Sequence, residues 1–371
     1  QWYQRHYGLV TGVSWVLSLS QKSMGRKKIT LRDLIGAIKD KASQSKATLL
    51  SNPSNLSLHL AVLRATTHAP SSSPPPDHHV SAILTLGDSS RATASSLIII
   101  LMDRLHRTGD STVALKCLLI VHQIIKRGPF ILQDQLSVFP ASGGRNYLKL
   151  SGFHDGSTSS TWTLSAWVRF YSRYLETLLF TSRILDYFLG SSPHNKEQEK
   201  ISCLLNSDLI RAVDSLIQLI EELIKLPDSL LLEGNKLLYE VVSTLSNDYL
   251  STVNELLLRL SEFKERLSCL SFGDSVELGF ILKRLKGCKE RLSVVFTIKK
   301  PSMELLWSLV SELSEKMDDL KVDKAGRKLL TFGKTSESAR FGNRVVKFDD
   351  SVQFSSGRYE IEVFGRAGRN E

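Results

Sequence analysis

Seven basic side chains and only two acidic ones lie in residues 24–50, which also contain a periodic apolar pattern. Leu31, Leu34, Ile35 and Ile38 follow the i, i+3, i+4, i+7 spacing of one helix face. A basic amphipathic helix of this kind is suited to lying on an anionic bilayer. The alternative is that the apolar face packs into the protein core and the lysines are solvated, because amphipathicity alone does not separate the two cases.

The histidine and cysteine residues give little sign of metal or redox chemistry. His122 lies within an apolar helical run and has no second ligand at i+4, so we expect a hydrogen-bonded core histidine. Cys117, Cys203, Cys269 and Cys288 form no Cys-x-x-Cys pair and lie among apolar residues. We therefore predict four buried thiols in a reducing compartment, with no metal site.

Gly-Asp-Ser occurs at 87–89, 109–111 and 273–275, a triplet found in one class of serine hydrolase. Each lies at an expected helix start, where Asp and Ser are ordinary capping residues. No Asp-His partner pattern accompanies them. The sequence also lacks the phosphate-binding loop, the dinucleotide fingerprint, the zinc-protease motif and the nucleophile elbow. We expect no catalytic residues and no cofactor, and hence not an enzyme.

The chain has 371 residues, of which 42% are apolar and 23% charged, as in globular proteins. Its net charge of +10 and pI of about 9.3 favour a polyanionic partner, either nucleic acid or an anionic membrane. Residues 24–50 contribute +5 of this charge and residues 324–371 another +4. No nucleic-acid-binding motif is present and no aromatic residues alternate with the lysines, so we expect no nucleic acid partner.

Nearly every strong periodic signal is helical, which predicts an all-α protein of helices joined by short connections. Residues 69–79 are predicted to be a loop, because their four prolines and three serines cannot sustain a helix. Two weakly alternating segments, 345–354 and 358–364, have the pattern of strands in a basic tail. Besides the helix from Leu31, the expected helices are 55–66, 91–107, 112–127, 162–189, 201–225, 230–245, 248–270, 274–297 and 302–321.

Three stretches resemble the ANTH domain of plant clathrin assembly proteins. They are LAVLRATTHAP at 60–70, MDRLHRTGDSTVALKCLLIVHQIIKRGP at 102–129, and YLKLSGFHDGSTSSTWTLSAWVRFYSRYLETLL at 147–179. The resemblance implies a right-handed α-solenoid that binds phosphoinositide-containing membranes and helps to recruit clathrin and coat adaptors. It also implies SNARE proteins as cargo.

The resemblance also implies a lipid-headgroup site, and the family's motif is only partly kept. Arg64 fills the basic position that opens the Ala-Thr-x-His segment, and His79 keeps the motif's last histidine. His78 replaces a basic residue and Pro76 occupies a lysine position, so headgroup affinity should be weaker or more acid-dependent. The residues expected to bind headgroups are Lys27, Lys28, Arg32, Arg64, His78 and His79.

Residues 24–297 are predicted to form the ANTH-like domain, followed at 298–371 by a short helix and a flexible basic tail. Residues 1–23 are predicted to be a non-native or upstream leader, since Met24 opens a natural-looking N-terminus. The predicted function is a cytoplasmic, peripheral adaptor on plasma-membrane coated pits, coated vesicles and the Golgi. The alternative is a helical scaffold of the same family without strong phosphoinositide or clathrin binding, because the tail has no Asp-Pro-Phe, Asn-Pro-Phe or acidic clathrin-box peptide.

Overall fold

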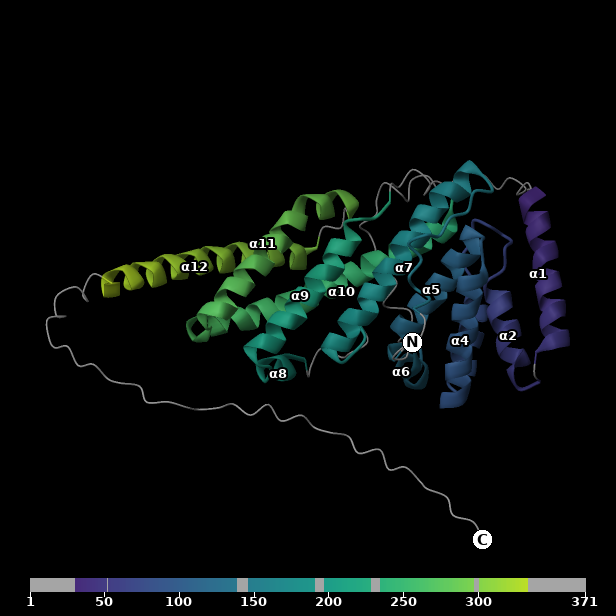
Figure 1. Ribbon diagram of the computed structural model, residues 1–371, viewed down its shortest axis with the longest axis horizontal. Helices are drawn as coiled ribbons and strands as arrows, with labels where there is room; N and C mark the ends of the chain where they lie inside the picture. Colours follow the sequence, from purple (N-terminus) through teal and green to yellow (C-terminus); the bar gives the residue numbers. More distant parts are fainter. Residues whose placement is uncertain are drawn as a thin grey trace, which may run out of the picture. The chain divides into compact units, whose positions relative to one another are not determined.

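The computed structural model describes residues 31–51, 53–138, 146–190, 197–227, 234–296 and 300–332. The chain divides into two units, residues 1–320 and 321–371. Within the described ranges the regular structure is helical throughout (Figure 1), as the sequence predicts. The predicted leader and the two weak strand patterns of the tail lie outside the described residues.

The first half of the larger unit consists of helices packed around α5, which is buried on nearly every side. The sequence makes this possible because residues 113–121 contain only one polar side chain, that of Lys116, so every helix face is apolar. The helices of this half are α1 (Leu31–Leu50), α2 (Pro53–Ala65), α3 (Asp77–Gly87), α4 (Arg91–Arg107), α5 (Ser111–Arg127) and α6 (Phe130–Ser137).

The second half stacks onto the first through α7, which packs against α5 on one side and α9 on the other. Helix α9 in turn packs against both α10 and α11, so the chain winds as a right-handed α-solenoid, and the predicted fold class is confirmed. The helices of this half are α7 (Ser159–Leu185), α8 (Glu197–Ser202), α9 (Asn206–Leu223), α10 (Lys236–Arg266), α11 (Phe272–Val295) and α12 (Pro301–Phe332), with a 3-10 turn, η4 (Leu267–Cys269), after α10.

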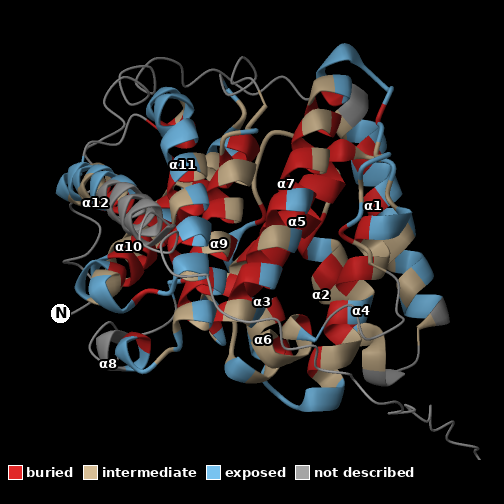
Figure 2. Cartoon of the chain, turned by 60° about the vertical axis from the view of Figure 1, so that its left-hand side comes forward, coloured by how far each residue is buried: buried red, intermediate tan, exposed pale blue. Residues whose placement is uncertain are grey.

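One continuous apolar core runs through these layers (Figure 2). Its largest fully buried side chains include three aromatic residues of α7, Trp167, Tyr171 and Tyr174. They follow the spacing of a single helix face, which is why one helix can join the two halves. Burying such side chains is the main driving force for stacking the helices.

The prediction of two helices at 230–245 and 248–270 is wrong, because α10 continues without a break. The residues at the predicted boundary, Ser246-Asn247-Asp248, have low helix propensity. Asp248 is fully buried, however, and its carboxylate is bound by side chains from α5 and α7. Tertiary contacts therefore override the local preference for a turn.

Three further helices differ from the sequence prediction. The predicted helix 201–225 is divided into α8 and α9 by a turn that contains Cys203. The predicted loop at 69–79 ends early, because α3 begins at Asp77. Helix α6 was not predicted, and it follows the turn at Gly128-Pro129. A Cβ atom at Gly128 would lie 2.4 Å from the Ile124 carbonyl oxygen, so only glycine allows the chain to turn this closely.

The structure confirms the predicted core role of His122 and corrects two of the cysteines. The His122 ring is fully buried and contacts Tyr171 and Asp248. Cys117 and Cys288 are buried thiols, whereas Cys203 and Cys269 are exposed because both lie in turns between helices. Apolar neighbours in the sequence did not reveal these turns.

The Gly-Asp-Ser triplets act at helix ends, although not all in the predicted role. Asp110 caps the start of α5 by accepting hydrogen bonds from the backbone N–H groups of Thr112 and Val113. Asp88 instead follows the end of α3. For α11 the cap is Ser271, which precedes its triplet and accepts from the Asp274 N–H. None of the described helices is long and apolar enough to cross a bilayer.

Candidate functional site

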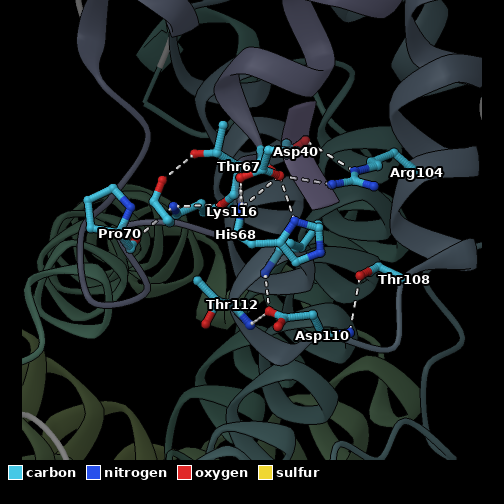
Figure 3. Close-up of polar contacts among 12 residues, drawn as sticks. Asp40, Thr67, His68, Pro70, Arg104, Thr108, Asp110, Thr112 and Lys116 are labelled. Carbon is cyan, nitrogen blue, oxygen red and sulfur yellow. Dashed lines mark hydrogen bonds and ion pairs between the residues drawn. The ribbon is translucent and has the colours of Figure 1, made fainter. Parts of the chain in front are cut away.

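The connection between α2 and α3, residues 66–76, is held against α1 by a histidine–aspartate pair (Figure 3). His68 Nδ1 lies 2.6 Å from Asp40 Oδ1, and the His68 backbone N–H donates to the same carboxylate at 2.9 Å. Burial alone would raise the pKa of Asp40, but these hydrogen bonds lower it below its ordinary value. Gly36 lies against the His68 side chain, where a Cβ atom would come within 2.8 Å, so α1 packs closely on this connection.

Two cations from the interior of the protein bind the backbone of the same connection. The Lys116 side chain is buried, and its Nζ donates to the carbonyl oxygens of Thr67 at 2.9 Å and Pro70 at 3.0 Å. Burial lowers the pKa of Lys116 to about 8, although nearby carboxylates including Asp40 oppose the shift. From α4, the Arg104 guanidinium donates to the Thr66 carbonyl at 3.2 Å.

Two backbone contacts fix the second half of the connection. The Ser71 N–H donates to Asp33 of α1 at 3.3 Å, and the Ser72 carbonyl accepts from the Leu237 N–H at the start of α10 at 3.0 Å. Four helices thus hold this irregular segment, and its conformation does not depend on its own turn propensities.

The structure brings together three of the residues predicted to bind headgroups. Arg64 and His78 are exposed, His79 is half-buried, and the two imidazole centroids are 4.0 Å apart. The pKa of His79 lies below its ordinary value because burial and the nearby positive charges of His78 and Arg64 disfavour a second proton. These three residues, which we call the rim, lie at the end of α2 and the start of α3.

The other flank of the rim is acidic. The Asp77 side chain is 95% exposed and lies 3.6 Å from Arg127. Behind it a cavity of about 270 Å³ is lined by three prolines and by Glu240, whose pKa is raised by burial and by Asp77. Arg127 shares this flank with the two carboxylates, whereas Arg64 and His79 lie on the side away from them.

Helix α1 turns its small and acidic residues inward and its large apolar residues outward. Ile38 is 68% exposed, and Leu34 and Ile35 are about half exposed. The alternative that this apolar face packs in the core is therefore wrong. Exposed lysines flank the face at positions 39, 41 and 46, which gives α1 the surface of an interfacial helix.

The remaining predicted headgroup residues stay predictions. Lys27 and Lys28 lie outside the described residues. Arg32 is the second residue of α1, and its side chain is not among those described. Among the described residues, no group of three or more His, Cys, Asp or Glu side chains is arranged to hold a metal.

Sequence reasoning missed the residues that hold the site. Asp40 was counted only as a charge of α1, His68 only as part of a motif, and Lys116 was not considered. Lys116 did give a signal, since a lysine within the apolar run of α5 must find partners if the helix is buried. Nothing in the sequence identified those partners as the carbonyls of Thr67 and Pro70.

Comparison with known proteins decides the family. Residues 57–250, about half of the chain, match the family model of the ANTH domain. The chain belongs to the ANTH-domain family. The match includes the rim, the 66–76 connection and all of α5 and α7. This family consists of adaptors and not enzymes, which agrees with the predicted lack of catalysis.

Three proteins of Arabidopsis thaliana are similar to this ANTH-domain chain over most of their length, and each is named "Putative clathrin assembly protein". The first is 50% identical over 343 residues, which is 88% of this chain and 93% of the relative. The second is 32% identical, covering 76% of this chain and 84% of the relative. The third is 28% identical, covering 77% of this chain and 99% of the relative.

Proposed function

We propose that this ANTH-domain protein is a peripheral membrane adaptor in clathrin-mediated endocytosis. The observation that carries the proposal is the outward apolar face of α1, flanked by lysines and held against the α2–α3 connection by the Asp40–His68 pair. The names of the relatives support a role in clathrin assembly. The membrane-binding domain of the proposal is residues 24–297, which contains the family match.

The rim would bind the phosphates of a phosphoinositide headgroup, with Lys27, Lys28 and Arg32 adding charge nearby. Arg64 offers a planar set of donors suited to phosphate oxygens. Each basic residue near an anionic membrane contributes about 1 kcal/mol. Because His78 and Pro76 stand where the family has basic residues, the headgroup is bound more weakly at neutral pH than by a full motif.

Binding at this rim should take up protons. A phosphate beside His79 favours the protonated imidazole, whereas burial and the positive charges of His78 and Arg64 lower the pKa of unliganded His79 below its ordinary value. The site therefore gains charge as the pH is lowered. Headgroup affinity should therefore rise on mild acidification, because binding is coupled to the uptake of protons by the site.

Co-sedimentation with vesicles tests the proposal. Vesicles containing phosphatidylinositol bisphosphate should bind the protein, and Arg64→Glu should weaken that binding at least tenfold, since it loses one cation and adds one anion. Arg211→Glu is the matched control, because Arg211 is an exposed arginine on α9. Added salt should weaken binding. Absence of binding at low salt and pH 6 would contradict the proposal.

A protein-binding role without lipid is the second candidate, and the surface of α11 favours it. Phe272 and Phe280 are each more than 60% exposed, and Val276 lies between them on the same helix face. Exposed aromatic residues in a row are characteristic of protein interfaces. The partner would be a SNARE helix or a coat adaptor.

Cross-linking in cells separates the two candidates. If Phe280→Asp loses its cross-linked coat or SNARE partners while Arg64→Glu keeps them, the protein acts as a scaffold. If both variants lose them, membrane recruitment precedes the protein contacts. For the adaptor role we propose plasma-membrane coated pits and coated vesicles as the location, with the Golgi as a second site, which fluorescence of the tagged protein beside clathrin would test.

A further inference from the structure

We propose that Trp162, in the first turn of α7, is a second membrane contact that inserts its indole into the bilayer interface. This inference rests on the proposed membrane role and extends it to a part of the chain outside the headgroup motif. A lipid interface is the occupant that fits the chemistry, because an indole combines a large apolar surface with one polar N–H.

The side chain of Trp162 is 59% exposed although it is the largest apolar residue type. Its position is fixed by the start of α7, where Thr158 and Thr161 form a reciprocal capping box. The His154 ring meets the indole edge-to-face at 4.4 Å between centroids. Five residues later Trp167 is fully buried, so the same helix presents one tryptophan to the core and one to the outside.

The exposure of Trp162 is not the result of a loose loop, because the preceding residues are firmly anchored. Asp155 is buried and accepts from the Ser111 N–H at 2.9 Å, while its own N–H donates to Ser165 Oγ at 2.8 Å. Arg169 donates to the Phe153 carbonyl at 2.7 Å. Because the backbone that carries Trp162 is already ordered, little conformational entropy would be lost when its side chain binds.

Trp162 lies at the same end of the helical body as the 67–70 segment of the α2–α3 connection, whereas Asp77, next to the rim histidines, lies further along α5 beside Arg127. Ser111 and Lys116, both on α5, hold the 155 and 67–70 segments respectively, and five helical residues span only about 7.5 Å. Figures 1 and 2 show the first turns of α1 and α7 and the α2–α3 connection at this one end. One membrane surface can therefore contact all three.

The charge around Trp162 suits an anionic surface. Residues 156–160 are exposed and consist only of Gly, Ser and Thr, and the nearest acidic residue, Asp155, is buried. Lys149 is exposed on the same connection, and the Arg107 side chain, which pairs with Asp103 at 3.2 Å, is 78% exposed at the adjoining end of α4. No exposed carboxylate in 151–163 would repel lipid phosphates.

Tryptophan fluorescence of the full chain tests the inference directly. In a Trp2→Phe/Trp15→Phe/Trp307→Phe background only Trp162 and the buried Trp167 emit. On addition of vesicles with phosphatidylinositol bisphosphate and brominated acyl chains, Trp162 emission should be quenched and that of Trp167 should not. Adding Trp162→Phe to the same background leaves Trp167 as the only tryptophan, so its emission alone can be measured. Trp162→Ala should weaken vesicle binding about tenfold, and Trp162→Tyr should restore most of it.

The outcomes separate this inference from the membrane role itself. If the protein co-sediments with the vesicles but Trp162 is not quenched, and Trp162→Ala binds like the wild type, the inference is overturned and the membrane role stands. If the protein binds no vesicle at pH 6 and low salt, the Trp162 inference and the proposed membrane role are both contradicted. Thermal unfolding of Trp162→Ala should match the wild type, because the side chain is exposed.

Discussion

Two polar clusters in this protein are built from the same three residue types, and both use helix α5. In the first, His68 and Asp40 pair beside Lys116, and the cluster lies against the backbone of the 66–76 connection. In the second, His122 Nε2 lies 2.8 Å from Asp248 and Lys126 Nζ lies 2.7 Å from the same carboxylate. The first is near the surface, and the second is closed within α5, α7 and α10.

The difference lies in what each lysine binds. Lys126 forms an ion pair with the Asp248 carboxylate, to which Tyr174 donates at 2.6 Å, and it also donates to the Leu189 carbonyl at 2.9 Å. Lys116 instead donates to two backbone carbonyls of the 66–76 connection and thereby fixes its conformation. The buried cluster ties helices together, whereas the surface cluster shapes a site. The predictions below run from the largest to the smallest expected change in the free energy of unfolding.

Asp248→Ala should produce the largest loss, about 3–5 kcal/mol, because it leaves the buried His122 and Tyr174, and the partly exposed Lys126, without their shared acceptor. Urea denaturation would measure it. Asp208→Ala, which breaks an exposed pair with Arg211 on α9, should change the stability by less than about 0.5 kcal/mol. Equal losses for the two variants would remove the distinction between buried and surface clusters.

Acid should remove part of the stability that the buried cluster contributes. Burial would raise the pKa of Asp248, but His122 and Lys126 hold it to about 2, below the ordinary 3.8. A carboxylate with a lowered pKa stabilises the fold above its unfolded pKa and loses that contribution as the pH falls towards 2. The expected loss is about 2 kcal/mol between pH 4 and pH 2. The Asp248→Asn variant should not lose this free energy of unfolding between pH 4 and pH 2. If its stability depends on pH in the same way as that of the wild type, the prediction is contradicted.

Asp40→Ala should cost less, about 1–3 kcal/mol, because the cluster near the surface can be partly rehydrated. Its effect should be local: amide hydrogen exchange should speed up in α1 and the 66–76 connection and remain slow in α7. Vesicle binding should fall by more than the loss of stability explains, since α1 loses its attachment. Uniformly faster exchange would mean that this cluster, too, holds the whole fold.

Ile38→Asp should leave stability within about 0.5 kcal/mol of the wild type, since Ile38 is exposed, and yet weaken vesicle binding about tenfold. Val294→Asp changes an equally exposed aliphatic residue on α11 and serves as the control in co-sedimentation. Parallel behaviour of the two variants would show that the apolar face of α1 has no special role.

The sequence was sufficient for the fold class and for most helix positions, because apolar periodicity records burial directly. Helix α4 occupies the predicted 91–107, and α5 differs by one residue. The unbroken α10 could not be foreseen, because the partners of Asp248 come from residues more than seventy positions away. The start of α3 at Asp77 was hidden by three prolines, although proline is tolerated just before a helix.

The candidate site was predictable only in its exposed part. Arg64, His78 and His79 were found through a resemblance in sequence, and the structure brings them together. The supporting residues Asp40 and Lys116 were missed, since their partners are backbone groups and a histidine on other elements. Sequence patterns record residue types and spacing, whereas backbone acceptors carry no side-chain signature.

The central claim is that a rigid connection presents a weakened, histidine-containing headgroup rim. Its most direct test restores the family's basic residues with Pro76→Lys/His78→Lys and measures co-sedimentation with phosphatidylinositol bisphosphate vesicles at pH 7.4 and pH 6. Two added cations should strengthen binding at pH 7.4 by at least about tenfold and reduce the gain on acidification. Unchanged binding at both pH values would contradict the account, because the rim would then not be where the headgroup is bound.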